Sequence, residues 1–206
     1  MRRSVRLLIV AFLAIIIISW NTSVINIGRA EEAFVTVISA AAYLPGALVL
    51  GRTLRHFGQG RPMIALLPPQ GVTSRQTDLL QQVGWEIQYV DLLQLPSHSR
   101  AVTWRFRDML TKLHAFNMTA FKRIALVDSD AYFVDNIDEA FELLKRSSAL
   151  LAASLPATRP VSPFFDSFAG HFNGGLIMLK PASGIYIKLL RLCRDPEYYD
   201  VTFAEQ

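Results

Sequence analysis

The chain has 206 residues, of which 51% are hydrophobic, so it can bury a sizeable core and is not disordered in bulk. Its formal net charge of +4 equals the charge of four arginines that precede Ala30, a stretch without acidic residues. The rest of the chain is therefore neutral and lacks the basic cluster that DNA or RNA binding usually requires, which excludes nucleic acid as a partner.

The N-terminus predicts a membrane anchor. Arg2, Arg3 and Arg6 precede an apolar run over residues 7–20, and positive charge before such a run holds the N-terminus in the cytoplasm. The run is short, so a cleaved signal peptide and a buried helix stay open beside an uncleaved anchor. We expect a single-pass type II protein of the Golgi or endoplasmic reticulum membrane. The predicted domains are residues 1–20 as cytoplasmic tail and signal anchor, 21–32 as stem and 33–206 as a luminal domain.

After the stem, strand-like apolar runs alternate with helical patterns. In chain order we predict strand 34–38, helix 44–54, strand 63–67, helix 73–83, strand 85–90, helix 108–118, strand 123–127, helix 137–146, strand 150–155, strand 172–179 and helix 182–194. This alternation predicts an α/β fold with a mainly parallel sheet flanked by helices and a ligand site at the carboxyl ends of strands. No Gly-x-Gly-x-x-Gly follows a strand, so a classical dinucleotide-binding fold is not expected.

The motif Asp128-Ser129-Asp130 directly follows the apolar strand that ends at Val127. In extended backbone, residues i and i+2 point to the same side, which would bring both carboxylates to the ligand edge of the sheet. Two carboxylates suit Mn²⁺ or Mg²⁺, and such a metal can bridge the phosphates of a nucleotide diphosphate. Turns and helix caps also produce Asp-x-Asp. Phosphatases of the haloacid-dehalogenase type share the motif, but with Thr or Val at the position of Tyr132.

Four blocks of the sequence resemble glycosyltransferase family 8, the family of glycogenin, and occur in the family's order. They are residues 33–54, Thr-Lys-Leu at 111–113, residues 123–141 and Phe-Asn-Gly-Gly at 172–175. Residues 113–119 also resemble fungal Golgi N-acetylglucosaminyltransferases of the same family. The resemblance implies a nucleotide-diphospho-sugar transferase (GT-A type) fold.

The resemblance also implies which residues bind the donor, a UDP-sugar. Positions lining the uracil and ribose are matched by Val37, Ser39 and Tyr43. The metal pair is matched by Asp128 and Asp130, with Ser129 between them in the nucleotide-binding motif. Each has a structural alternative; Tyr43, for example, would simply pack against the first helix.

Five further positions match residues around the reacting sugar. Lys112 matches the lysine that reaches the phosphate or the sugar, although a solvated helix lysine is the alternative. Asn173 and Gly174 match the floor under the sugar, although Asn173 also suits a turn. Glu205 and Gln206 occupy the place of an Asp-Gln pair near the reacting carbon.

The resemblance implies transfer of a sugar from UDP-sugar to a hydroxyl of a carbohydrate or glycoprotein, with retention of configuration and assistance by Mn²⁺ or Mg²⁺. Ala40 replaces a family Asn, Glu205 replaces an Asp, and the family's His-x-x-Gly-x-x-Lys segment does not follow Gln206. We therefore expect an incomplete transferase domain. A non-catalytic short form that binds UDP-sugar or a partner is the alternative. The sugar, the acceptor and homodimer formation stay open.

Overall fold

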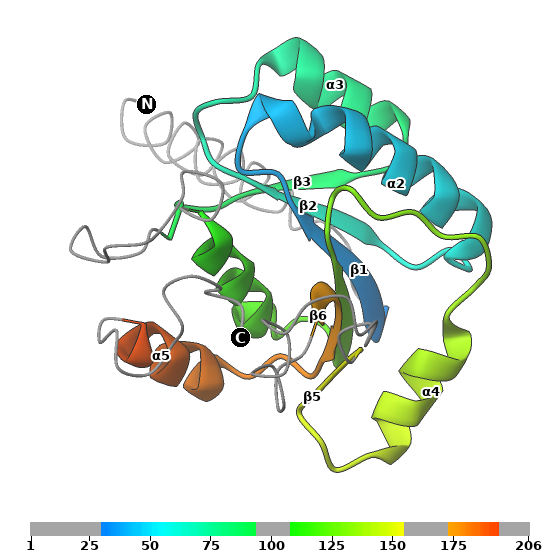
Figure 1. Cartoon of the computed structure of the whole chain (residues 1–206), viewed down its shortest axis with the longest axis vertical. Helices are drawn as coiled ribbons and strands as arrows, with labels where there is room; N and C mark the ends of the chain where they lie inside the picture. Colours follow the sequence, from blue (N-terminus) through cyan, green and yellow to red (C-terminus); the bar gives the residue numbers. More distant parts are fainter. Residues whose placement is uncertain (1–29, 94–107, 155–172, 194–206) are drawn as a thin grey trace, which may run out of the picture. The chain divides into compact units, whose positions relative to one another are not determined.

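The structure is a computed structural model, and it describes residues 30–93, 108–154 and 173–193 (Figure 1). The chain divides into two units, residues 1–30 and 31–206, and every element below lies in the second. The predicted anchor lies outside the described residues. Among the residues that are described, no helix has the length and apolarity needed to cross a membrane.

The described strands form one mixed sheet in the order β3-β2-β1-β4-β6-β5. Their bounds are β1 (Glu32–Val37), β2 (Met63–Leu67), β3 (Glu86–Tyr89), β4 (Arg123–Val127), β5 (Leu151–Ser154) and β6 (Asn173–Leu179). The first four strands pair in parallel, whereas β6 runs antiparallel to β4 and to β5. The sheet is thus α/β and mainly parallel, as predicted, with an antiparallel strand next to β4.

Helices cover both faces of the sheet (Figure 1). One face carries α2 (Leu44–Phe57), α3 (Ser74–Gln82) and α4 (Asp138–Arg146), and the other carries η3 (Met109–Asn117) and α5 (Ser183–Leu192). All five residues of β2 and of β4 are buried, as continuous apolar runs predict for strands covered on both sides. The bounds of these two strands match the prediction.

Local signals explain where the helices begin. Pro45 lies in the first turn of α2, where its missing N–H costs no helical hydrogen bond. Thr73 precedes α3 and forms a capping box with Gln76. Trp85 is buried and its Nε1 donates to the Ala47 carbonyl over 2.9 Å, so it packs α2 against the sheet.

The predicted helix over residues 108–118 is instead a 3₁₀ helix, η3. Its backbone hydrogen bonds include Met118 N to Ala115 O, a three-residue step. At nine residues, η3 is longer than 3₁₀ segments usually are. Over so short a stretch, the apolar periodicity of the sequence does not distinguish a 3₁₀ helix from an α-helix.

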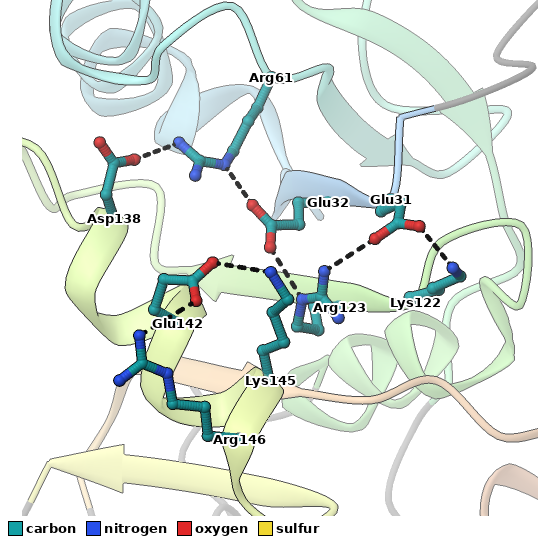
Figure 2. A network of polar contacts seen from close by, with 9 residues as sticks. All are labelled: Glu31, Glu32, Arg61, Lys122, Arg123, Asp138, Glu142, Lys145 and Arg146. Atoms are coloured by element: carbon teal, nitrogen blue, oxygen red, sulfur yellow. Dashed lines mark hydrogen bonds and ion pairs between the residues drawn. The ribbon is translucent and has the colours of Figure 1, made fainter.

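A network of charged side chains lies at the amino ends of β1 and β4 (Figure 2). Glu32 and Arg123 are register partners in the two strands, and their side chains pair over 2.8 Å. Arg61 pairs with Glu32 over 2.8 Å and with Asp138 over 2.5 Å. Its guanidinium also lies 4.4 Å from the centroid of the Phe141 ring, which joins the network to the core.

Hydrogen bonds from Lys122 and Arg123 hold the pKa of Glu31 below its usual value. A carboxyl whose pKa is lower in the folded protein stabilises the fold at neutral pH. That contribution is lost as the pH falls through the pKa of the folded state.

We predict that Arg123→Met destabilises the protein by about 1–3 kcal/mol, because it removes a nearly buried partner of Glu32. Urea unfolding measures the change. Arg146→Met is the matched control: the side chain is 79% exposed and lies 3.7 Å from Glu142, so its effect should stay within about 0.5 kcal/mol. Equal effects of the two substitutions would contradict a structural role for the network.

Candidate active site

Segments of three neighbouring strands lie at the carboxyl edge of the parallel strands. β1 ends at Val37 and β4 ends at Val127, so Ser39 and Asp128 follow neighbouring strands at the same edge. β6 runs the other way and therefore begins at this edge with Asn173. The Asp128 N–H donates to the Gly175 carbonyl over 2.9 Å, which extends the pairing of β4 and β6 by one step.

The acidic motif forms a turn rather than extended backbone. The Ala131 N–H donates to the Asp128 carbonyl over 3.1 Å, which closes a turn across Ser129 and Asp130. The expectation that strand alternation aligns the two carboxylates is therefore wrong, because alternation holds only while the strand continues. Asp128 is half-buried, Ser129 is buried and Asp130 is exposed.

Two residues that the sequence did not single out hold this turn. Thr36 is fully buried in β1, and its hydroxyl donates to the Val127 carbonyl over 2.8 Å. Gly46 lies in the first turn of α2, where a Cβ would come within 2.4 Å of the Ser129 carbonyl oxygen. The helix reaches the acidic turn only because residue 46 has no side chain. The roles of Thr36 and Gly46 become apparent only from the structure, which brings β1 and α2 next to the acidic turn.

Lys112 of η3 and Asp128 form the central contact of the site. The Lys112 Nζ lies 2.6 Å from the Asp128 Oδ1, and the side chains are 17% and 32% exposed. Partial burial keeps water from screening this pair as fully as it screens surface ion pairs. The structure thus brings together two predicted site residues that lie on different elements.

A row of polar side chains fixes η3. Leu93 N donates to the Thr111 hydroxyl over 3.1 Å, and the Ser183 hydroxyl lies 2.9 Å from the Asn117 Oδ1. Between them, His114 Nε2 lies 2.8 Å from the Asp91 carbonyl and His114 Nδ1 lies 3.0 Å from the Tyr186 hydroxyl.

The tautomer of His114 follows from its partners. A carbonyl only accepts, so Nε2 carries the proton and Nδ1 of the neutral ring accepts from Tyr186. Burial, with a smaller effect of Asp91, raises the pKa of Tyr186, which keeps this donor protonated. These contacts give His114 a structural role, because they hold the helix that carries Lys112.

Of the remaining predicted residues, those that the structure describes lie at or just after the end of β1, on η1 and at the start of β6. Val37 ends β1, Ser39 follows it half-buried, and Tyr43 ends the short 3₁₀ helix η1 (Ala41–Tyr43) with 37% of its surface exposed. Gly174 is buried in β6, one residue after Asn173. Glu205 and Gln206 lie outside the described residues.

The acidic turn contains two carboxylates, Asp128 and Asp130, which are hard oxygen ligands of the kind that divalent metals bind. Within the described ranges, no three His, Cys, Asp or Glu side chains gather as a metal cage. The Lys112 ammonium nevertheless shows that Asp128 holds a cation at this edge. Asp128 and Asp130 therefore fit Mn²⁺ or Mg²⁺ if water and phosphate oxygens complete the shell, as both ions commonly allow.

Known proteins with similar sequences are glycosyltransferases. No family model matches the chain. It is 28% identical over 182 residues to inositol phosphorylceramide glucuronosyltransferase 1 of Arabidopsis thaliana, an alignment that covers 88% of this chain and 30% of that protein. It is 29% identical over 173 residues to glycogenin-1 of Mus musculus, which covers 82% of this chain and 47% of that protein. The chain is thus similar in sequence to glycogenin and to a plant glucuronosyltransferase.

The fold agrees with this relationship. The glycosyltransferase GlyE of Streptococcus pneumoniae TIGR4 superposes with a TM-score of 0.55 at 17% identity, over 81% of this chain and 40% of that chain. The glycogenin-like chain thus has the predicted α/β fold of GT-A type glycosyltransferases. It spans less than half the length of both curated relatives.

We predict that Gly46→Ala destabilises the glycogenin-like chain by about 1–3 kcal/mol, because the new methyl group would meet backbone atoms that have little room to move. Gly184→Ala in α5 is the matched control, since a Cβ there has no neighbour within 4 Å. It should be neutral or stabilise by up to about 1 kcal/mol. Urea unfolding compares them, and an unperturbed Gly46→Ala protein would disprove the close approach.

Proposed function

We propose that this glycogenin-like chain forms the donor-binding part of a retaining glycosyltransferase that uses a UDP-sugar. In the reaction, the bond between the anomeric carbon and the diphosphate oxygen breaks and UDP leaves with the bonding electron pair. The acceptor hydroxyl oxygen bonds to that carbon and gives up its proton. The observation that carries the proposal is the Lys112–Asp128 pair at the carboxyl edge of the sheet. It places a cation-binding carboxylate and a potential phosphate ligand together, at the edge where α/β folds bind ligands.

Each side chain has a proposed task. Val37, Ser39 and Tyr43 lie at the end of β1 and on η1, where they would line the uracil and ribose. Asn173 and Gly174 begin β6 beside Asp128 and would support the donor sugar. Glu205 and Gln206 are proposed, from the resemblance alone, to lie near the reacting carbon.

Three residues would neutralise the charge of the diphosphate, directly or through a metal. Asp128 and Asp130 would hold Mn²⁺ or Mg²⁺, which when bound neutralises charge on the diphosphate. Lys112 would bind a phosphate oxygen through its ammonium group. Stabilising the charge that grows on departing UDP is worth more to the rate than binding the ground state more tightly.

The acceptor is proposed to be a hydroxyl of a carbohydrate or glycoprotein. The name of the Arabidopsis relative adds inositol phosphorylceramide as a third class to test. An acceptor panel should therefore contain an oligosaccharide, a glycoprotein and this lipid. Homodimer formation is a separate proposal that size measurement in solution tests.

We predict that the double variant Asp128→Asn, Asp130→Asn loses metal-dependent UDP binding. Asparagine keeps the shape of each side chain but removes the negative charge that attracts the cation. Isothermal titration with UDP in the presence of Mn²⁺ should lose its signal, while circular dichroism stays unchanged.

The matched control is Asp135→Asn, an exposed aspartate in the segment that follows the acidic turn. It should bind UDP as the native protein does. Undiminished binding by the double variant would refute the assignment. Release of UDP from a panel of UDP-sugars then separates a transferase from the alternative form that only binds.

We also propose that the described domain lies in the lumen of the Golgi or endoplasmic reticulum, with residues 1–20 as cytoplasmic tail and anchor. Support comes from Arg2, Arg3 and Arg6 ahead of the apolar run. In sealed microsomes, we predict that protease degrades the domain only after detergent is added. Digestion without detergent would contradict this topology.

A further inference from the structure

We infer that Lys112 is an exchangeable counter-cation, which makes metal binding and diphosphate binding at this site depend on each other. This inference rests on the proposed function. Its starting point is the 2.6 Å contact between Lys112 Nζ and Asp128 Oδ1. The carboxylate that would hold the metal thus has an ammonium partner in the structure.

Metal and Lys112 compete for Asp128. A divalent ion on Asp128 would lie next to the ammonium, and like charges a few ångströms apart in a partly buried site repel strongly. The contact is therefore broken or weakened when the metal binds. The metal alone binds weakly because its binding costs the contact between Lys112 and Asp128.

A diphosphate removes that cost by giving Lys112 a new anionic partner. The helix itself stays in place, because Thr111, His114 and Asn117 fix η3 to residues 91–93 and to α5. Only the aliphatic side chain of Lys112 has to change its rotamer, which its four-carbon chain permits. Metal and diphosphate thus each bind more tightly when the other is present, and the coupling is equal in both directions.

The substitution that tests this is Lys112→Met, which keeps the length of the side chain and removes its charge. Mn²⁺ added alone should bind this variant roughly three- to tenfold more tightly than the native protein. The ratio of Mn²⁺ dissociation constants without and with saturating UDP should fall by a similar factor. The coupling that remains reports direct contact between metal and phosphate.

Electron paramagnetic resonance of free Mn²⁺ measures these constants directly, with the full-length chain. Lys112→Arg keeps a cation beside Asp128 and should keep the weak binding of Mn²⁺ alone. Lys122→Met removes the same charge from the other end of β4, where it pairs with Glu31, and should change nothing. Uridine, which lacks phosphate, should produce no coupling in any variant.

Thermal unfolding gives a second measurement if Lys112→Met is poorly stable. Because that variant leaves Asp128 without its ammonium, Mn²⁺ should raise its midpoint more than that of the native protein. Unchanged Mn²⁺ affinity and unchanged coupling in Lys112→Met would overturn the inference, although UDP binding with metal would still support the proposed function. Failure of the native protein to bind UDP with metal would overturn both.

Discussion

The pairing of β1 with β4 is the constraint on which the candidate site depends. At the amino ends, the Glu32–Arg123 ion pair joins register partners. At the carboxyl ends, the buried Thr36 hydroxyl binds the Val127 carbonyl. A shift of one residue would break both contacts and turn the buried side chains of β4 to the opposite faces. It would also move Asp128 away from the reach of Lys112, so the register sets the chemistry as well as the core.

The two edges of the sheet use charge differently. At the amino edge, two arginines bind carboxylates from several segments through planar groups with many fixed donors (Figure 2). These planar guanidinium groups fix the positions of the carboxylates that they bind, which suits a structural role. The lysine at that edge, Lys122, is exposed, whereas the cation at the carboxyl edge is a largely buried lysine, whose ammonium is a point charge on a flexible side chain. An exchangeable partner is useful only where a ligand has to enter, which distinguishes the candidate site from the structural network.

The sequence predicted the features that arise locally. β2 and β4 were located to the residue because a strand buried on both faces is continuously apolar. The family was recognised from short motifs, and the fold class followed from the alternation of elements. The conformation of the acidic motif was predicted incorrectly, because an extended backbone was assumed beyond Val127. Thr36 and Gly46 were missed because their partners lie 91 and 83 residues away.

The 3₁₀ winding of η3 shows how tertiary contacts decide a local conformation. Residues three apart are aligned in a 3₁₀ helix, whereas in an α-helix each such step drifts by about 60°. Thr111, His114 and Asn117 are spaced by three, and all three are bound by neighbouring segments. An α-helix would spread this row around its axis and lose part of these contacts. The spacing was present in the sequence, but its role becomes apparent only when residues 91–93 and α5 supply the partners. Lys112 directly follows Thr111, so the hydrogen bond that fixes Thr111 also holds in place the residue that pairs with Asp128.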